Sequence, residues 1–371
     1  MKSSIARRGA YGSACGALAV LAFALAGPAS AAKPVKKAKA KPAEAAAPKA
    51  YPIVTPIDTG SPSILSRRAI ETAGAYRAYM DRAARISSAF KSGAEVEASL
   101  MNGAQADAQQ LSQGVIAYAA VLALSDPSFV AGVRSQASDA DSRRELARRI
   151  IENPNLATTL PVSASAVGPI SAGLGADGSR VAGAGALVKQ AAYDVQHSAW
   201  SKASVPSPLV RLAKAKSLSL MTMKGTEAEL AAIARSVAAA DAITPANAVT
   251  TASMSAPTTP TVSRGLAIAA LAALGAGGEA DEGVVLSLMN DPNAGFCMSM
   301  SKLNLNQCLS VSRPYYEDVF CLGQHILIDI GQCVVKGAGQ SPVPMAAATF
   351  ACGGDAAASQ APAVAAYAAP R

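Results

Sequence analysis

The chain has 371 residues, of which 51% are hydrophobic and only 4% aromatic, and its formal net charge is +8. The excess charge does not belong to the body of the protein. Of the 33 basic and 25 acidic residues, nine basic and one acidic lie in residues 1–50, which leaves 24 of each in residues 51–371. A nucleic-acid groove needs a basic face on the fold itself, together with aromatic side chains for stacking. Nucleic acid is therefore not an expected partner.

Residues 1–31 have the pattern of a cleaved secretory signal peptide. Three basic residues come first, an apolar stretch follows at 14–26, and small residues precede the expected cleavage site between Ala31 and Ala32. The apolar stretch is shorter than the roughly 20 residues of a membrane-spanning helix. We therefore predict export to the periplasm, with further secretion left open, and no transmembrane segment in the mature chain. A retained N-terminal anchor is the alternative.

Three low-complexity segments divide the rest of the chain. Residues 32–60 are rich in Lys, Ala and Pro and predict a disordered linker, either a tether to anionic envelope surfaces or a solvated spacer. Residues 244–263 read as a Thr/Ser/Pro-rich linker, and residues 353–371 as a low-complexity tail. Between them we expect a helical domain at 61–243 and a helical, cysteine-containing region at 264–352. The sequence leaves open whether these two pack together.

Helix formers dominate both regions, and strictly alternating apolar runs are missing, so the predicted fold is mainly α, an irregular multi-helix array or bundle with disordered termini. Residues 107–124 show helical spacing, and Asp126-Pro127 should end that helix. Small residues throughout 163–192 and 265–278 predict closely packed helices. We also expect helices to begin at two capping boxes, Ser142 with Glu145 and Thr226 with Glu229.

Five cysteines follow the predicted cleavage site, and all lie in the last quarter of the chain: Cys297, Cys308, Cys321, Cys333 and Cys352. Cys308 with Cys321 and Cys297 with Cys333 share almost the same midpoint, at Pro314-Tyr315, where the proline favours a turn. Antiparallel helices at 295–311 and 316–336 would therefore be stapled by two nested disulfides, with Cys352 left as the odd cysteine.

This arrangement resembles, in geometry only, the helical hairpins with spaced cysteine pairs of small disulfide-stapled proteins. Cys297 and Cys308 are about three helical turns apart, but the twelve residues from Cys321 to Cys333 leave that pair about a third of a turn out of phase. Partial alternation of apolar residues in this region leaves short strands as a competing interpretation.

The predicted second helix carries the residue pattern that most suggests metal binding or catalysis in this chain. Glu317, Cys321, His325, Asp329 and Cys333 recur at every fourth residue, and thiolate, imidazole and carboxylate on one face could bind zinc or copper. Cysteines held as disulfides cannot ligate a metal, so the competing interpretation is a polar seam around structural disulfides with His325 hydrogen-bonded. We predict no metal or other cofactor and no catalytic residue.

Two further patterns partly match known functional motifs. Ser88 to Lys91 and Ser299 to Lys302 match the S-x-x-K motif of penicillin-binding enzymes, but the companion S-D-N and K-T-G motifs are missing from the sequence. His197 and Trp200 lie one helical turn apart and could bind a small apolar ligand, although such a pair more often serves packing.

The sequence therefore predicts an exported cell-envelope protein of structural or interaction type: a scaffold, adaptor or assembly factor whose partner is an envelope protein or a cell-wall or membrane surface. The alternative is an envelope enzyme or metal-binding protein that uses the ladder from Glu317 to Cys333.

Overall fold

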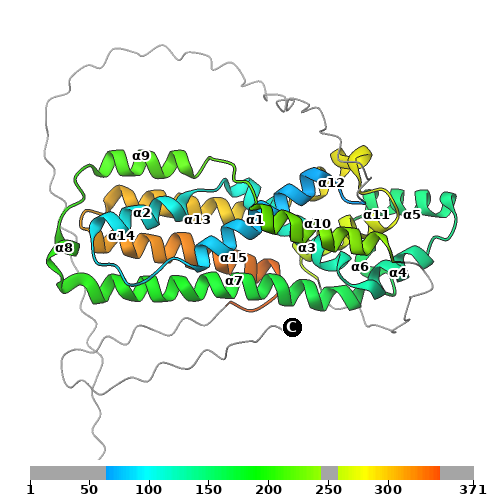
Figure 1. Ribbon diagram of the computed structural model, residues 1–371, viewed down its shortest axis with the longest axis horizontal. Coiled ribbons are helices and arrows are strands. Elements are labelled where there is room, and N and C mark those ends of the chain that lie inside the picture. The colour runs from blue at the N-terminus through cyan, green and yellow to red at the C-terminus, as the bar shows by residue number, and fades with distance from the viewer. Residues whose placement is uncertain (1–63, 244–257, 343–371) are drawn as a thin grey trace, which may run out of the picture. The chain divides into compact units, whose positions relative to one another are not determined.

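The structure is a computed structural model that describes residues 64–243 and 258–342, and these residues are mostly helical, as predicted. Within them no strand forms, and the single β-type contact is an isolated bridge between Ser204 and Pro314. The helical elements, shown in Figure 1, are α1 (Arg67–Ala84), α2 (Gly93–Ala104), α3 (Ala108–Leu124), α4 (Pro127–Ser135), α5 (Ala140–Glu152), α6 (Leu156–Thr159), α7 (Ser163–Asp194), η1 (Val195–His197), α8 (Ala199–Lys202), α9 (Pro208–Leu218), α10 (Glu227–Asp241), α11 (Pro260–Ala273), η3 (Glu279–Asp281), α12 (Glu282–Leu288), α13 (Pro292–Val311), α14 (Tyr315–Cys321), η4 (Leu322–Ile328) and α15 (Asp329–Gly337).

Local capping decides where several of these helices begin. The capping box at α10 is confirmed, because the Thr226 hydroxyl accepts from the Glu229 amide and the Glu229 carboxylate accepts from the Thr226 amide. The prediction that Ser142 caps α5 is wrong. The helix begins at Ala140 and its N-cap is Asp139, three residues before Ser142; the Asp139 carboxylate accepts from the amides of Asp141 and Ser142. A carboxylate is at least as good an N-cap as a hydroxyl, and Asp139 takes the position.

The long apolar helix α3 lies at the centre of the core. It packs against α1, α7, α11 and α13, and most of its side chains are buried. It ends at Leu124 as predicted, and Asp126 then caps α4, where Pro127 occupies the first turn. The apolar side chains of both predicted helical regions belong to one buried cluster, since α11 contacts α3 while η4 and α15 contact α7. The two regions therefore share a core.

One predicted boundary needs correction. The predicted Thr/Ser/Pro-rich linker at 244–263 includes residues 260–263, which form the first turn of α11. Thr259 is the N-cap, its hydroxyl accepting from the Val262 amide, and Pro260 stands in the first turn, where its missing amide costs no hydrogen bond. The predicted signal peptide, the linker at 32–60 and the tail at 353–371 lie outside the described residues, as does the rest of the 244–263 linker as far as residue 257.

Small residues bring α7 into backbone contact with the helix formed by α14, η4 and α15. A Cβ placed on Gly178 would lie 2.6 Å from the carbonyl oxygen of Gly331, and one on Gly185 would lie 2.7 Å from the Ile328 amide nitrogen. Gly323 approaches the backbone of Lys189 equally closely. This confirms the close packing that the small residues of 163–192 predicted, and it fixes the cysteine-bearing helix against the longest helix of the fold.

The helix from Tyr315 to Gly337 is also apolar enough, with a mean hydropathy of 1.3, and long enough to cross a membrane. However, 72% of its most apolar window is buried within the protein, which is typical of a core helix. Helices α3 and α4, taken together as one span, are also long and apolar enough, but the two are bent by 82° relative to each other.

Candidate functional site

The cysteine hairpin combines the features most suggestive of a function. Helix α13 runs to Val311, the chain turns at Pro314, and α14, η4 and α15 return as one helix. Disulfides join Cys297 to Cys333 and Cys308 to Cys321, each with a Cα–Cα distance of 5.8 Å. The stapled helical hairpin of the fold prediction is therefore confirmed, and no strand forms in the described part of this region. Cys352 lies outside the described residues.

A π-helical segment resolves the phase problem between Cys321 and Cys333. In an α-helix, twelve residues would turn the second cysteine about 120° away from the first. Residues Leu322–Ile328 form a π-helix, whose wider turns absorb one extra residue. The remaining eleven-residue spacing matches that of Cys297 and Cys308, so both disulfides form across the same seam.

Between the two disulfides lies a hydrogen-bonded polar chain. His325 Nδ1 is 2.8 Å from Asp329 Oδ2, and the Gln324 amide donates to Asp329 Oδ1 at 2.8 Å. Lys189 of α7 donates to the side-chain oxygen of Gln324, also at 2.8 Å, and its ammonium lies over the ring of Phe320. The chain therefore links an imidazole, a carboxylate, an amide and an ammonium across two helices.

Electrostatics keep the Asp329 carboxylate charged. Burial alone would raise its pKa, but hydrogen bonds from His325 and Gln324, with further help from Asn304, more than offset this and lower the pKa below its ordinary value. The charged Asp329 fixes the orientation of the His325 ring, whose side chain is 18% exposed. The imidazole and carboxylate of this pair can exchange hydrogen bonds with another polar group between the two disulfides.

The structure separates the remaining members of the predicted ladder. Cys321 and Cys333 are in disulfides, and Glu317 accepts a hydrogen bond from the Arg313 amide at the turn. Only His325 and Asp329 contact each other. Within residues 64–243 and 258–342, no group of three or more His, Cys, Asp or Glu is arranged to bind a metal ion.

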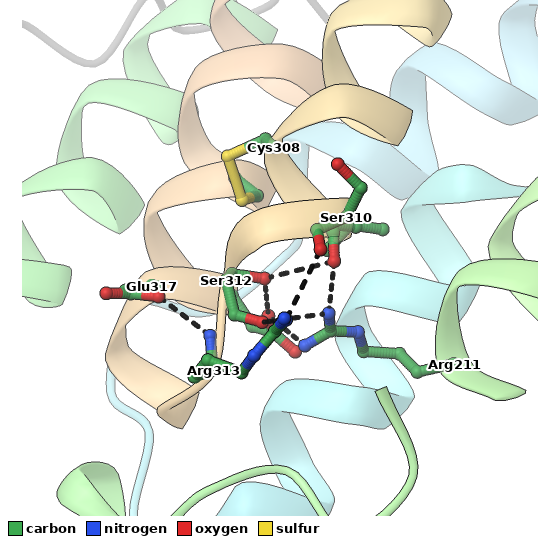
Figure 2. A network of polar contacts seen from close by, with 9 residues as sticks. Arg211, Cys308, Ser310, Ser312, Arg313 and Glu317 are labelled. Carbon is green, nitrogen blue, oxygen red and sulfur yellow. Dashed lines mark hydrogen bonds and ion pairs between the residues drawn. A yellow bond between two sulfur atoms is a disulfide. The ribbon is translucent and has the colours of Figure 1, made fainter. Parts of the chain in front are cut away.

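A buried ion pair anchors the surface helix α9 at the turn of the hairpin (Figure 2). Arg211 and Asp318 are joined at 2.5 Å, and both side chains are only 2% exposed. The guanidinium also donates to the carbonyl oxygens of Leu309 and Ser312, and the Ser312 hydroxyl donates to Asp318 at 2.8 Å. Burial raises the pKa of Asp318 more than Arg211 and Ser312 lower it. A buried ion pair is weak evidence for added stability, but these contacts tie α9 to the turn of the hairpin.

A second buried charge lies on α13. The Lys302 ammonium donates to the carbonyl oxygen of Ala104 at the end of α2, at 2.9 Å, and lies over the ring of Tyr79. Burial, reinforced by the like charge of Arg82, lowers the pKa of Lys302 to about 7, against a smaller opposing effect of Asp107. This lysine therefore caps a helix end whose carbonyls favour positive charge.

The other sequence candidates do not assemble into sites. Ser299 is exposed on α13 whereas Lys302 is buried, so the S-x-x-K match there does not bring hydroxyl and ammonium together. His197 ends η1, the chain extends at Ser198, and Trp200 belongs to the separate helix α8, where it packs against the core. His197 itself is exposed.

Sequence reasoning missed both buried charges. The burial of Lys302 could have been predicted, because it shares a helical face with three apolar residues. These are Met298, Leu305 and Leu309, and all three are core residues. The burial of Arg211 could not have been predicted from the local sequence, since its carboxylate partner, Asp318, lies 107 residues away.

Comparison of the chain with protein-family models, curated proteins and solved structures finds no match to any of them.

Proposed function

We propose that this protein is exported to the periplasm and serves the cell envelope as a scaffold, adaptor or assembly factor, with a binding role and not a catalytic one. The observation that carries the proposal is the pair of nested disulfides in the hairpin. Structural disulfides persist in oxidising compartments and are rare in the reducing cytosol. The signal-peptide pattern at residues 1–31, with cleavage between Ala31 and Ala32, supports the same compartment.

Exposed apolar side chains support a binding role. Phe296, Leu303 and Val311 are 68%, 46% and 72% exposed on α13, the first helix of the hairpin. At about 100° per residue they lie on one side of the helix, and an exposed apolar stripe is a feature of surfaces that meet other molecules. The disulfides fix the helix that carries these residues, and a rigid face loses less entropy when it binds.

Non-reducing peptide mass spectrometry on the protein isolated from fractionated cells tests the proposal. We expect the periplasmic fraction to contain a chain that begins at Ala32, with Cys297 linked to Cys333 and Cys308 linked to Cys321. A cytoplasmic chain that retains Met1 and has reduced cysteines would overturn it.

The alternative, a metal-binding protein or enzyme built on the ladder, draws its support from the His325–Asp329 pair alone. Metal analysis of the same preparation distinguishes the two proposals. A stoichiometric metal that is lost in a His325→Ala variant would favour the alternative.

A further inference from the structure

Helix α9 buries an unusual face. The residues that point inward are Arg211, Ala215 and Ser219, spaced four apart, and all three are buried. Arg211 binds Asp318 as described above, and the Ser219 hydroxyl donates to the carbonyl oxygen of Ala104. The helix packs on α2 and α13, beside which it lies in Figure 1. This polar anchoring fixes the orientation of α9. Leu212 and Leu218 are half-buried and pack against the core, whereas Leu209 and Val210 lie on the exposed side.

The outward face of α9 exposes large apolar side chains near the start of the helix. Leu209 and Val210 are 78% and 66% exposed, and Ala213 on the same face is exposed as well. Leu220 and Met221 follow directly after the helix and are 76% and 44% exposed. Four of the nine large hydrophobic side chains that the described residues expose therefore lie within residues 209–221. Exposed apolar side chains concentrated in one segment are a feature of surfaces that bind other molecules.

Lysines border this apolar face. At about 100° per residue, Lys214 and Lys216 lie on opposite sides of the face centred between Ala213 and Ser217, and both are exposed. Lys214 has Glu97 of α2 at 3.8 Å, whereas Lys216 makes no ion pair with any described residue. Residues 195–226 contain no acidic side chain. The surface of α9 thus combines exposed apolar groups with positive charge.

We propose that the outward face of α9 docks on an anionic lipid surface. This inference rests on the proposed function and names its partner within the envelope. Apolar side chains of a surface helix enter the boundary between headgroups and acyl chains, while lysines at the edges extend along their stems to the acidic headgroups. The two lysines at opposite edges fit a planar anionic surface. A protein partner would instead need acidic groups at two fixed positions around an apolar pocket.

Vesicle co-sedimentation of the chain as isolated from cells tests the proposal. Vesicles of phosphatidylethanolamine with phosphatidylglycerol provide the anionic surface, and phosphatidylcholine vesicles provide the neutral one. We expect binding to the anionic vesicles only, and we expect it to weaken in about 1 M salt, where the screening length falls to about 3 Å.

Two variants assign the binding to α9. Leu209→Ser with Val210→Ser should lower the partition coefficient at least about tenfold, because two aliphatic side chains no longer leave water. Lys214→Gln with Lys216→Gln should lower it about fivefold for each lysine. The matched controls are Leu187→Ser, at a side chain 65% exposed on α7, and Lys91→Gln, at an exposed lysine. Both controls should bind as the parent does.

Three results would overturn the proposal. The parent could fail to bind anionic vesicles. The α9 variants could also bind as tightly as the parent, which would assign the binding to the lysine-rich linker at 32–60. Light scattering could also show an oligomer that only the α9 variants dissociate, which would assign the face to a second copy of the chain. Since the assay uses purified protein, its outcome does not depend on export, so a failure of the proposed function is seen separately in the cell fractions.

Discussion

Gly331 provides a sharp test of the packing between α7 and the cysteine hairpin. A Cβ added by Gly331→Ala would lie 2.6 Å from both the Ala182 amide nitrogen and the Gly178 carbonyl oxygen. Both atoms belong to the backbone of α7, so no side-chain rotation can relieve the contact. The helices must separate or bend, and the disulfides oppose movement of α15 because Cys333 is tied to α13.

Two opposing effects set the size of the change. Alanine is favoured over glycine inside a helix by about 1 kcal/mol, and overpacking a close contact costs about 1–3 kcal/mol. Gly183→Ala is the matched control, because a Cβ on Gly183 has no neighbour within 4 Å and this glycine is also inside a helix. We expect Gly183→Ala to stabilise the protein by about 0.5–1 kcal/mol. Gly331→Ala should be about 1–3 kcal/mol less stable than this control.

Urea unfolding followed by circular dichroism under non-reducing conditions measures both variants. The comparison requires equal m-values, which show that the two variants expose the same surface on unfolding. If Gly331→Ala is as stable as Gly183→Ala, the backbones of α7 and α15 are not in contact, and the argument from small residues is refuted.

Two further predictions concern the buried charges. In a double-mutant cycle, Asp318→Leu alone should cost about 3–5 kcal/mol because it leaves Arg211 charged and buried, whereas Arg211→Met with Asp318→Leu should recover most of that loss; a double variant as unstable as the single one would contradict this. For Lys302, the folded-state pKa of about 7 lies below the unfolded value of about 10.4, so between these values the unfolded chain binds the extra proton and stability should rise with pH, by at most about 1.4 kcal/mol per pH unit. Lys302→Met should remove this rise and be more stable than the parent below pH 7, and parallel pH profiles for the two proteins would show that Lys302 is not the titrating group.

The cysteine pairing could be predicted because it depends on local periodicity. Two pairs with one midpoint and a proline at that midpoint define a hairpin whatever the rest of the chain does. The π-helix could not be predicted, although its signal was present in the twelve-residue spacing from Cys321 to Cys333. A spacing that fails the α-helical period by one residue can indicate either a wrong pairing or an inserted residue. Only the packing of η4 against Gly185 and Lys189 of α7 decides between them.

The caps show a similar limit at shorter range. Thr226 with Glu229 stands alone as a start signal after Gly225, and the structure forms that capping box. Around α5, Asp139 and Ser142 are both acceptable caps, and local sequence cannot rank them. Asp139 takes the position, and Ser142 donates its hydroxyl to that carboxylate at 2.5 Å.

The orientation of α9 could not be obtained from hydrophobicity at all. The large apolar side chains of α9, at 209, 210, 212 and 218, lie all around the helix, so their periodicity defines no single inward face. In the structure Arg211 faces inward because Asp318, Leu309 and Ser312 supply acceptors for its guanidinium, at a turn next to the Cys308–Cys321 disulfide. Leu209 and Val210 remain exposed to water as a result, and a surface that covered them would remove the cost of that exposure. The stapled hairpin and the proposed lipid-binding face are therefore connected, because the hairpin positions the acceptors that turn the apolar side of α9 outward.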